Sequence, residues 1–241
     1  SFFDYDKDGD LDAYILNNSN IPVSSLGYAE QRDKRAQDWE NVPTIFRGVG
    51  DMLLRNDNGK FVDVSEQAGI YGSLIGFGLG VMVTDMNGDL YPDIYVSNDF
   101  YERDYLYINN QDGTFKEDIT NWTSHLSLSA MGVDIADINN DGNADIFITD
   151  MLPEADQRVK SVMEFEGYNV FKLKQSKDFS QQYIQNTLQL NNGNSTFSEV
   201  AYFSGVAKTD WSWAGLLFDM DNDGYKDIFI TNGINHDLTD L

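Results

Sequence analysis

The sequence predicts an all-β fold built from repeated four-stranded antiparallel units, and three observations support this prediction. An acidic turn sequence occurs four times in the 241 residues. Short segments rich in β-branched and aromatic residues flank each copy, as is typical of strands. Two further strand-like segments, the first ending in Asn and the second following a turn, come after each of the first three copies. Four strands per unit, repeated along a chain, is the sequence pattern of a β-propeller blade.

The first two units differ in the link between their second and third strands. The first unit has its turn "DYDKDGDLD" at residues 4–12 and later strands in "DMLLRN" and "GKFVDVS". A polar insertion at residues 17–50 lies between them, and we expect a short helix near residues 26–40. The second unit reads "GFGLGVMVTD", the turn "DMNGDLYPD" at residues 85–93, "DIYVSND", "DYLYIN" and "GTFKEDI", with only a short link.

The third unit resembles the first in having a long insertion. It reads "SAMGVDIAD", the turn "DINNDGNAD" at residues 137–145, "DIFITD", an insertion at residues 151–185, "NTLQLN" and "STFSEVA". In the insertion, Pro153 suits a helix start. Val159, Val162, Met163 and Glu166 then follow helical spacing, which predicts an amphipathic helix packed on its own domain.

The fourth unit supplies only "SWAGLLFD", the turn "DMDNDGYKD" at residues 219–227 and "DIFITNG". Trp211 and Trp213 alternate in its first strand, and we expect both to pack in the core. The units together predict a single partial β-propeller over residues 1–241, with about three and a half blades present, that belongs to a longer propeller. The acidic turns join strands one and two, and the insertions join strands two and three. The turns and the insertions are therefore expected on opposite faces.

The acidic turns have the oxygen-rich pattern of a calcium site. Each has Asp or Asn at positions 1, 3 and 5 and Asp at position 9. Side-chain oxygens at 1, 3 and 5 and the backbone carbonyl of position 7 suit a hard cation such as Ca²⁺. A helix–loop–helix calcium site would need Glu at position 12, where this chain has Ile or Val. Asp, Asn and Gly also form turns without any ion, but four copies in one register favour the metal interpretation.

The predicted metal ligands fill positions 1, 3, 5, 7 and 9 of the four turns. They are Asp4, Asp6, Asp8, Asp10, Asp12, Asp85, Asn87, Asp89, Tyr91, Asp93, Asp137, Asn139, Asp141, Asn143, Asp145, Asp219, Asp221, Asp223, Tyr225 and Asp227. We expect up to four Ca²⁺ ions, one in each turn.

Composition excludes several other classes of function. The chain has 40 acidic and 16 basic residues, a net charge of −24, which argues against nucleic acid and anionic membranes as partners. It has no cysteine, so disulfides and thiolate metal sites are excluded. No nucleophile elbow, zinc motif or phosphate loop is present. The two histidines, His125 and His236, are expected to be ordinary loop residues, and the chain is not expected to be an enzyme.

Long stretches of the sequence resemble a known repeat family. "GVDIADINNDGNADIFITD" and "WSWAGLLFDMDNDGYKDIFITNG" resemble the FG-GAP/VCBS repeats of integrin-α-like β-propellers. "SNDFYERDYLYINNQDGTFKE" and "NTLQLNNGNSTFSEV" resemble bacterial VCBS-repeat proteins of the ASPIC/UnbV-associated type. The resemblance implies a propeller of seven blades or a similar number, a Ca²⁺ ion in each turn, and an extracellular or bacterial cell-surface setting at the outer membrane exterior. Leu90 at position 6, in place of Gly, and Asn87 depart from the family pattern and predict a weaker or differently shaped second site.

In integrins the face opposite the calcium turns binds the ligand, and that is the face assigned here to the insertions. The sequence therefore predicts a calcium-stabilised, non-catalytic binding or adhesion module for a protein or a glycan. A structural subunit of a larger surface assembly is the first alternative, and a polysaccharide-acting enzyme is the second. An exposed platform formed by Trp39, Tyr28 and Phe46 would favour the glycan.

Overall fold

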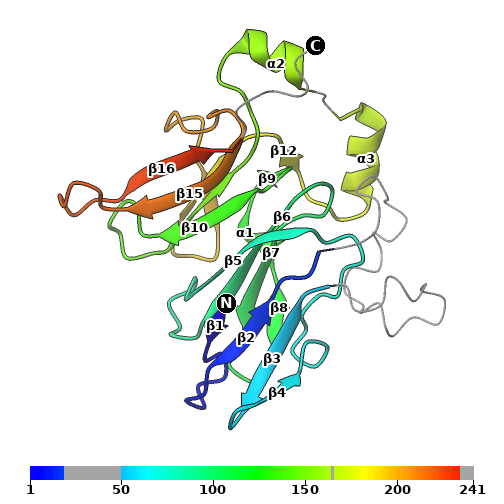
Figure 1. Cartoon of the computed structure of the whole chain (residues 1–241), viewed down its shortest axis with the longest axis vertical. Coiled ribbons are helices and arrows are strands. Elements are labelled where there is room, and N and C mark those ends of the chain that lie inside the picture. The colour runs from blue at the N-terminus through cyan, green and yellow to red at the C-terminus, as the bar shows by residue number, and fades with distance from the viewer. Residues whose placement is uncertain (19–49, 164–165, 234–241) are drawn as a thin grey trace. The chain divides into compact units, whose positions relative to one another are not determined.

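Antiparallel sheets of four strands are the repeated element of the computed structural model, which describes residues 1–18, 50–163 and 166–233 (Figure 1). The chain divides into two compact units, Ser1–Ile119 and Thr120–Leu241. Unit 1 contains two of the sheets, with strand orders β1-β2-β3-β4 and β5-β6-β7-β8. Their strands are β1 (Phe2–Phe3), β2 (Asp12–Ile15), β3 (Met52–Asp57), β4 (Lys60–Asp63), β5 (Gly78–Thr84), β6 (Asp93–Asn98), β7 (Tyr105–Asn109) and β8 (Phe115–Glu117).

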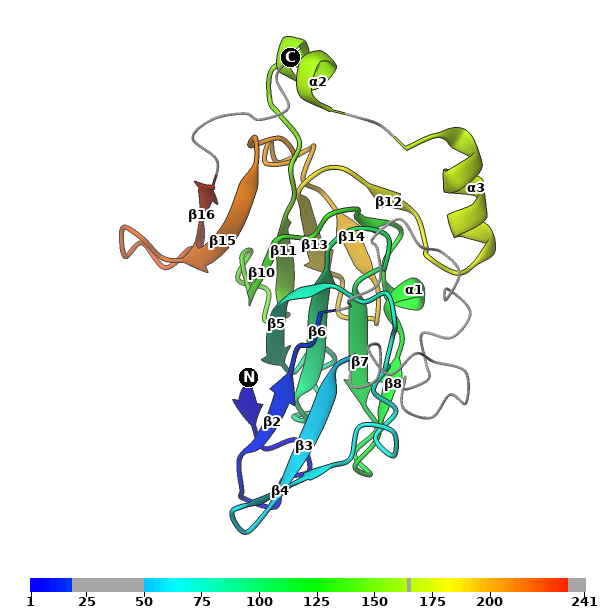
Figure 2. The ribbon, with the colours of Figure 1, turned by 45° about the vertical axis from the view of Figure 1, so that its right-hand side comes forward.

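Unit 2 contains the third complete sheet, with strand order β10-β11-β13-β14 (Figure 2). Two short strands, β9 and β12, pair in parallel, and β15 and β16 form an antiparallel pair. The elements from the end of unit 1 onward are α1 (Ile119–Trp122), β9 (Leu126–Ser127), β10 (Gly132–Ala136), β11 (Asp145–Thr149), α2 (Asp156–Val162), α3 (Tyr168–Ser176), β12 (Gln182–Tyr183), β13 (Thr187–Asn191), β14 (Phe197–Glu199), β15 (Ser212–Phe218) and β16 (Asp227–Asn232).

The predicted strands are confirmed in all three four-stranded sheets. The second strand of each sheet lies between two hydrogen-bonded neighbours and carries an apolar centre. All residues of β6 and β11 are buried. In unit 1 the core gathers around Tyr14, Leu53 and Tyr107. In unit 2 a core cluster forms around Phe147 and Leu188.

The insertion of the third sheet forms two helices where one was predicted. Helix α2 begins at Asp156 rather than at Pro153, because the backbone at Ala155 is still extended. It ends at Val162, and Met163 is again extended, so the stripe predicted to run to Glu166 is interrupted. No residue of α2 is fully buried, but Val159 and Val162 are half-buried, and Arg158 joins the helix to Asp210 of the same unit at 2.7 Å. The first predicted insertion, its helix and the Trp39 platform lie almost wholly outside the described residues, as does His236.

Two further observations concern the helices and the last hairpin. No helix among the described residues is long and apolar enough to cross a membrane. Trp213 in β15 is 45% exposed, so the prediction that it packs in the core is wrong. In the described part of the chain β15 and β16 form a sheet only with each other. Strand β15 still packs against the third sheet, because Leu217 belongs to the core cluster of Phe147 and its amide donates to Asp134 Oδ2 at 2.7 Å.

Candidate metal centre

The four acidic turns share one set of backbone hydrogen bonds. In the first turn the amides of Asp8 and Gly9 lie 3.1 and 3.0 Å from the two carboxylate oxygens of Asp4. The same two bonds recur at Asp85, Asp137 and Asp219, at 2.7–3.1 Å. The amide of position 7 donates to the carboxylate of position 5 at 2.8 Å in every turn. The carboxylates at positions 1 and 5 therefore hold the shape of each turn themselves.

Positions 4 and 6 of every turn have left-handed backbone, which explains the glycines. In the third turn Asn140 has φ 60° and Gly142 has φ 91°. The second turn exchanges the residues, with Gly88 at φ 76° and Leu90 at φ 72°. The Leu90 amide still donates to Asp85 Oδ2, at 2.7 Å. The second turn thus keeps the backbone of the others, and its difference from the family pattern is strain at Leu90 rather than a new shape.

Position 9 connects each of the first three turns to the third strand of its sheet. In the first turn the buried Asp12 accepts the Tyr5 amide at 3.1 Å with one oxygen and the Asn56 amide at 2.8 Å with the other. Asp93 and Asp145 make the equivalent pairs of bonds at 2.8–3.0 Å. In the fourth turn Asp227 accepts the Met220 amide at 2.9 Å. A predicted ligand position is therefore also a clamp between strands.

The Asn that ends each third strand completes this clamp, a role that the sequence analysis missed. Asn56, Asn109 and Asn191 each donate from Nδ2 to the carbonyl of turn position 8, at 3.0–3.3 Å. Each also accepts, on Oδ1, an amide of the turn that leads to the fourth strand, at 2.7–3.0 Å. The sequence does carry a signal for this role, because 28 or 29 residues separate each of these Asn residues from the first Asp of the next turn.

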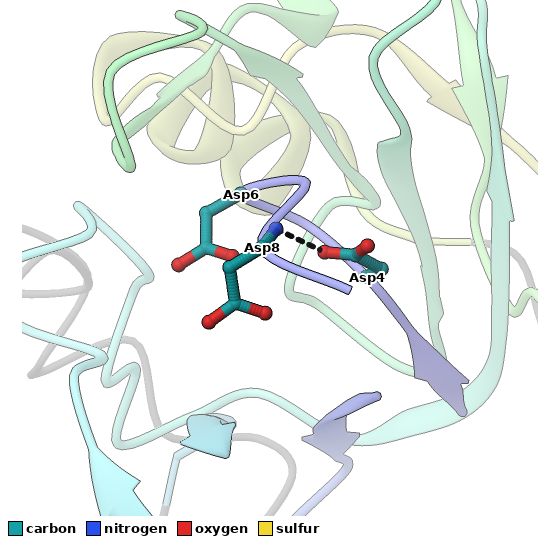
Figure 3. Close-up of side chains that lie close together, drawn as sticks. All are labelled: Asp4, Asp6 and Asp8. Atoms are coloured by element: carbon teal, nitrogen blue, oxygen red, sulfur yellow. Dashed lines mark hydrogen bonds between the residues drawn. The ribbon is translucent and has the colours of Figure 1, made fainter. Parts of the chain in front are cut away.

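The first and fourth turns gather three carboxylates each. Oxygens of Asp4, Asp6 and Asp8 lie within 4.8 Å of one another (Figure 3). Oxygens of Asp219, Asp221 and Asp227 do the same. In the first turn Asp6 Oδ1 is buried and accepts no hydrogen bond within the described residues. An all-oxygen cluster with an unsatisfied buried oxygen fits a hard cation such as Ca²⁺.

The second and third turns have Asn at position 3, and this Asn changes the local charge. Asn87 Nδ2 donates to Asp89 Oδ2 and Asn139 Nδ2 donates to Asp141 Oδ2, both at 3.0 Å. No group of three carboxylates as close as those above forms in these two turns, among the residues that the structure describes. In these two turns the Asn amide therefore offsets part of the negative charge of the position 5 carboxylate, as a cation would.

Burial and hydrogen bonding push the carboxylates in opposite directions. Burial raises the pKa of Asp93 to about 6, against the bonds from the Asn109 and Met86 amides. Burial, and next the charge of Asp8, raise the pKa of Asp6. The hydrogen bond from the Asn143 amide lowers the pKa of Asp141. A cation beside the raised groups would favour their charged forms.

Residues 85–148 match the family model of the FG-GAP-like repeat. The chain contains an FG-GAP-like repeat. This segment runs from position 1 of the second turn into β11, so it includes the second and third turns. The first and fourth turns lie outside it but repeat its hydrogen bonds at Asp4 and Asp219. The ligand roles of the twenty predicted residues stay predictions.

Solved structures add a distant likeness. A lectin from Agrocybe aegerita, described as recognising non-reducing terminal N-acetylglucosamine, is 17% identical to this chain with a TM-score of 0.36. The match covers 74% of this chain and 40% of the lectin chain. No curated protein matches the chain.

Neighbouring turns touch within each unit, in the FG-GAP-like repeat and beyond it. In unit 1 Lys7 Nζ lies 3.9 Å from the ring centroid of Tyr91, which joins the first and second turns. In unit 2 Asn140 Nδ2 donates to Gly224 O at 3.0 Å, which joins the third and fourth turns. Position 4 is thus the contact point in both units, and the turns of a unit lie on one face of it.

Proposed function

We propose that this chain is a calcium-stabilised, non-catalytic binding module that works outside the cell or on the cell surface. The observation that carries the proposal is the three-carboxylate cluster of the first turn, Asp4, Asp6 and Asp8, on a backbone that all four turns share. Extracellular calcium sites are adequate at millimolar affinity, because the ion is abundant there. Up to four Ca²⁺ ions are proposed, one in each turn.

The proposed role of the ion is structural. Ca²⁺ supplies positive charge to carboxylates that otherwise repel one another. Positions 1, 3 and 5 and the carbonyl of position 7 would hold it. Position 9 would contribute while its oxygens keep the two strands clamped. An ion at this point would stabilise the strand one–strand two hairpin and the start of strand three together, because the clamp joins them.

The ligand surface is proposed on the insertion of unit 2. Tyr168 and Leu173 of α3 are exposed large apolar side chains on a short helix. Exposed apolar groups gathered on one element favour a binding role over a purely structural one. A protein or a glycan partner fits such a surface, and the expectation that the chain is not an enzyme stays a prediction.

A subunit of a larger assembly is the second candidate, and one observation favours it. The β15–β16 hairpin exposes Trp213, Leu216, Phe218 and Phe229. An exposed apolar hairpin with an open edge is a site where another strand can add.

A calcium titration of thermal stability tests the proposal. The chain is stripped with EDTA, and its Tm is followed against Ca²⁺, with Mg²⁺ as the control. An ion that binds only the native state stabilises by about 2.7 kcal/mol per site at a hundredfold excess over Kd. Asp6→Asn removes one charge from the first cluster and is expected to reduce the calcium shift. Asp63→Asn, a change outside the turns, is the control. Equal shifts with Ca²⁺ and Mg²⁺, or none, would contradict the calcium role.

A further inference from the structure

A pocket of about 330 Å³ lies between α3 and the paired strands β9 and β12 in unit 2. Its walls include Glu166, Tyr168, Phe171, Gln182 and Tyr183. The volume is at the small end of the range for ligand sites, which suits one or two ring-sized groups rather than a long segment of chain.

Leu128 in the pocket wall follows β9 and is held in place by an acid, Asp150. Asp150 follows β11, and its buried Oδ2 accepts Ser127 Oγ at 2.6 Å and the amides of Leu128 and Gln185 at 3.1 and 3.3 Å. These bonds fix β9 and the segment after β12 to the end of β11. This part of the pocket wall is therefore preorganised, which lowers the entropic cost of ordering the site when a ligand binds.

The charges around the pocket are internally balanced. Lys174 Nζ lies 3.2 Å from Glu166 Oε1, and the Lys174 side chain is buried. Lys172 Nζ lies 5.7 Å from the ring centroid of Tyr168, so a cation of the chain itself already faces that ring. Neither an anion nor a cation finds an uncompensated partner here. The net charge of −24 further disfavours an anion.

Two exposed rings and nearby polar groups are the features of the pocket that can contact a neutral ligand. Tyr168 is 71% exposed and Tyr183 is 41% exposed, so both offer ring surface to a ligand. The edge of the Tyr183 ring packs against His125, with centroids 5.3 Å apart, which fixes its position. Carboxylate and amide groups of Glu166 and Gln182 in the wall can exchange hydrogen bonds with hydroxyls. Ring faces beside such groups suit a ligand that is apolar on one face and hydroxylated at its rim.

We propose that this pocket binds a neutral saccharide of one or two sugar units. The inference deepens the proposed binding function and rests on the insertion being its ligand surface. Tyr168 is the residue to test, because its exposure means that its truncation leaves the fold intact.

The test uses the full chain on an array of neutral, acidic and amine-bearing oligosaccharides, followed by calorimetry with the neutral sugar that binds best. Maltotriose, cellotriose and mannotriose represent the neutral class. Oligogalacturonate and chitosan oligomers represent the charged classes. Tyr168→Ala is expected to weaken neutral-sugar binding about tenfold, the upper range for one aromatic contact. Tyr168→Phe keeps the ring and is expected to bind normally. Tyr202→Ala is the matched control, because Tyr202 is 57% exposed in the same unit and also has a lysine, Lys208, near its ring.

Each outcome decides the inference. Neutral-sugar binding that Tyr168→Ala reduces and Tyr202→Ala does not would support it, even if calcium had no effect on Tm. Binding that ignores Tyr168, or that prefers the charged oligomers, would overturn it. Capture of no neutral sugar, while calcium still raises Tm, would overturn the pocket and leave the calcium-stabilised scaffold standing.

Discussion

The second and third sheets have the same strand order, and they differ most in the partner of one buried glutamate. Glu117 at the end of β8 and Glu199 at the end of β14 occupy equivalent positions. Oε1 of Glu117 accepts the amides of Leu106 and Ile119 at 3.2 and 3.1 Å. Oε1 of Glu199 accepts two amides in the same arrangement, at 3.2 and 2.7 Å.

The second oxygen of each glutamate meets a different basic side chain. Glu117 Oε2 lies 2.8 Å from Arg103 Nη2, and the Arg103 side chain is only 2% exposed. Glu199 Oε2 lies 3.3 Å from His125 Nε2, and that side chain is 22% exposed. Arg presents a planar guanidinium that is always charged, whereas His presents a smaller ring. The second sheet therefore has a fully buried ion pair where the third has a longer contact nearer to water.

The two sheets also exchange an acid and an amide at the end opposite the acidic turns. In the second sheet Asp104 Oδ1 accepts the Asn98 amide at 2.7 Å, and its Oδ2 accepts Tyr95 Oη at 2.6 Å. In the third sheet Asn186 Oδ1 accepts the Asp150 amide at 2.7 Å. The acid thus lies before the third strand in the second sheet, as Asp104, and after the second strand in the third sheet, as Asp150. Phe147 occupies the position that corresponds to Tyr95, and no carboxylate lies at the position of Asp104 to accept a hydroxyl hydrogen.

Removing the cation of each pair should give the largest difference between the sheets. Arg103→Leu leaves Glu117 charged, buried and without its ion-pair partner, and is expected to lower the free energy of unfolding by about 3–5 kcal/mol. His125→Leu exposes Glu199 to nearby water and is expected to cost only about 1 kcal/mol. Urea denaturation followed by circular dichroism measures both. Similar losses for the two variants would show that the pairs are equivalent despite their burial.

Asp150 should make the free energy of unfolding fall as the pH rises. A carboxylate whose pKa is lowered by folding has the opposite effect. Burial raises the pKa of Asp150 to about 6, although the bonds from Ser127 and three amides oppose the rise. The folded state therefore binds this proton more tightly than the unfolded state, whose pKa is near 4. The contribution of Asp150 to stability is fully present below pH 4 and declines by up to about 3 kcal/mol as the pH rises through 6.

Unfolding by urea at pH 4.5, 6 and 7.5 measures this dependence against Asp150→Asn, which cannot titrate. The variant is expected to be less stable at every pH, since its amide cannot accept from all the donors around it. Its stability should decline less between pH 4 and 6 than that of the unmodified chain, and the decline that remains belongs to other buried carboxyls such as Asp93. The second sheet offers the control, because Asn98 already holds the equivalent position. A decline of the same size in the variant and in the unmodified chain would mean that Asp150 does not contribute to the pH dependence.

These differences explain which parts of the molecule the sequence could predict. The turns and strands follow from local rules, since Asp, Gly and apolar residues recur at fixed spacing. The ion pairs join residues far apart in the chain, such as His125 and Glu199, and no spacing rule connects them. The exchange of Asn98 and Asp104 for Asp150 and Asn186 was readable by aligning the units on position 9 and on the Asn that ends the third strand. The result of the exchange is that Asp150 holds β9 and the segment after β12 together. This contact could be seen only in the structure.

Deleting the tyrosine hydroxyl should distinguish the sheets by a smaller amount. Tyr95→Phe removes the donor to Asp104 Oδ2 within a fully buried pair, and is expected to cost about 1–2 kcal/mol. Tyr14→Phe should behave alike, because Tyr14 Oη donates to Asp51 Oδ2 at 2.9 Å in the first sheet. Phe147→Leu in the third sheet is a size control without a hydroxyl. Unfolding in urea measures all three variants, and a neutral Tyr95→Phe would mean that water replaces the hydroxyl.

The smallest expected effect concerns the left-handed residue at position 6 of the second and third turns. Leu90 has φ 72° where the third turn has Gly142 at φ 91°. A Cβ at Gly142 would meet nothing within 4 Å, so only backbone strain separates the two residues. Gly142→Leu is expected to lower the free energy of unfolding by about 1 kcal/mol. Leu90→Gly is expected to raise it by less, about 0.5 kcal/mol, because the glycine also gains freedom in the unfolded chain. Both are measured in EDTA, so that calcium binding does not contribute. A loss of stability in Leu90→Gly would mean that the exposed leucine side chain makes a favourable contact that outweighs its strain.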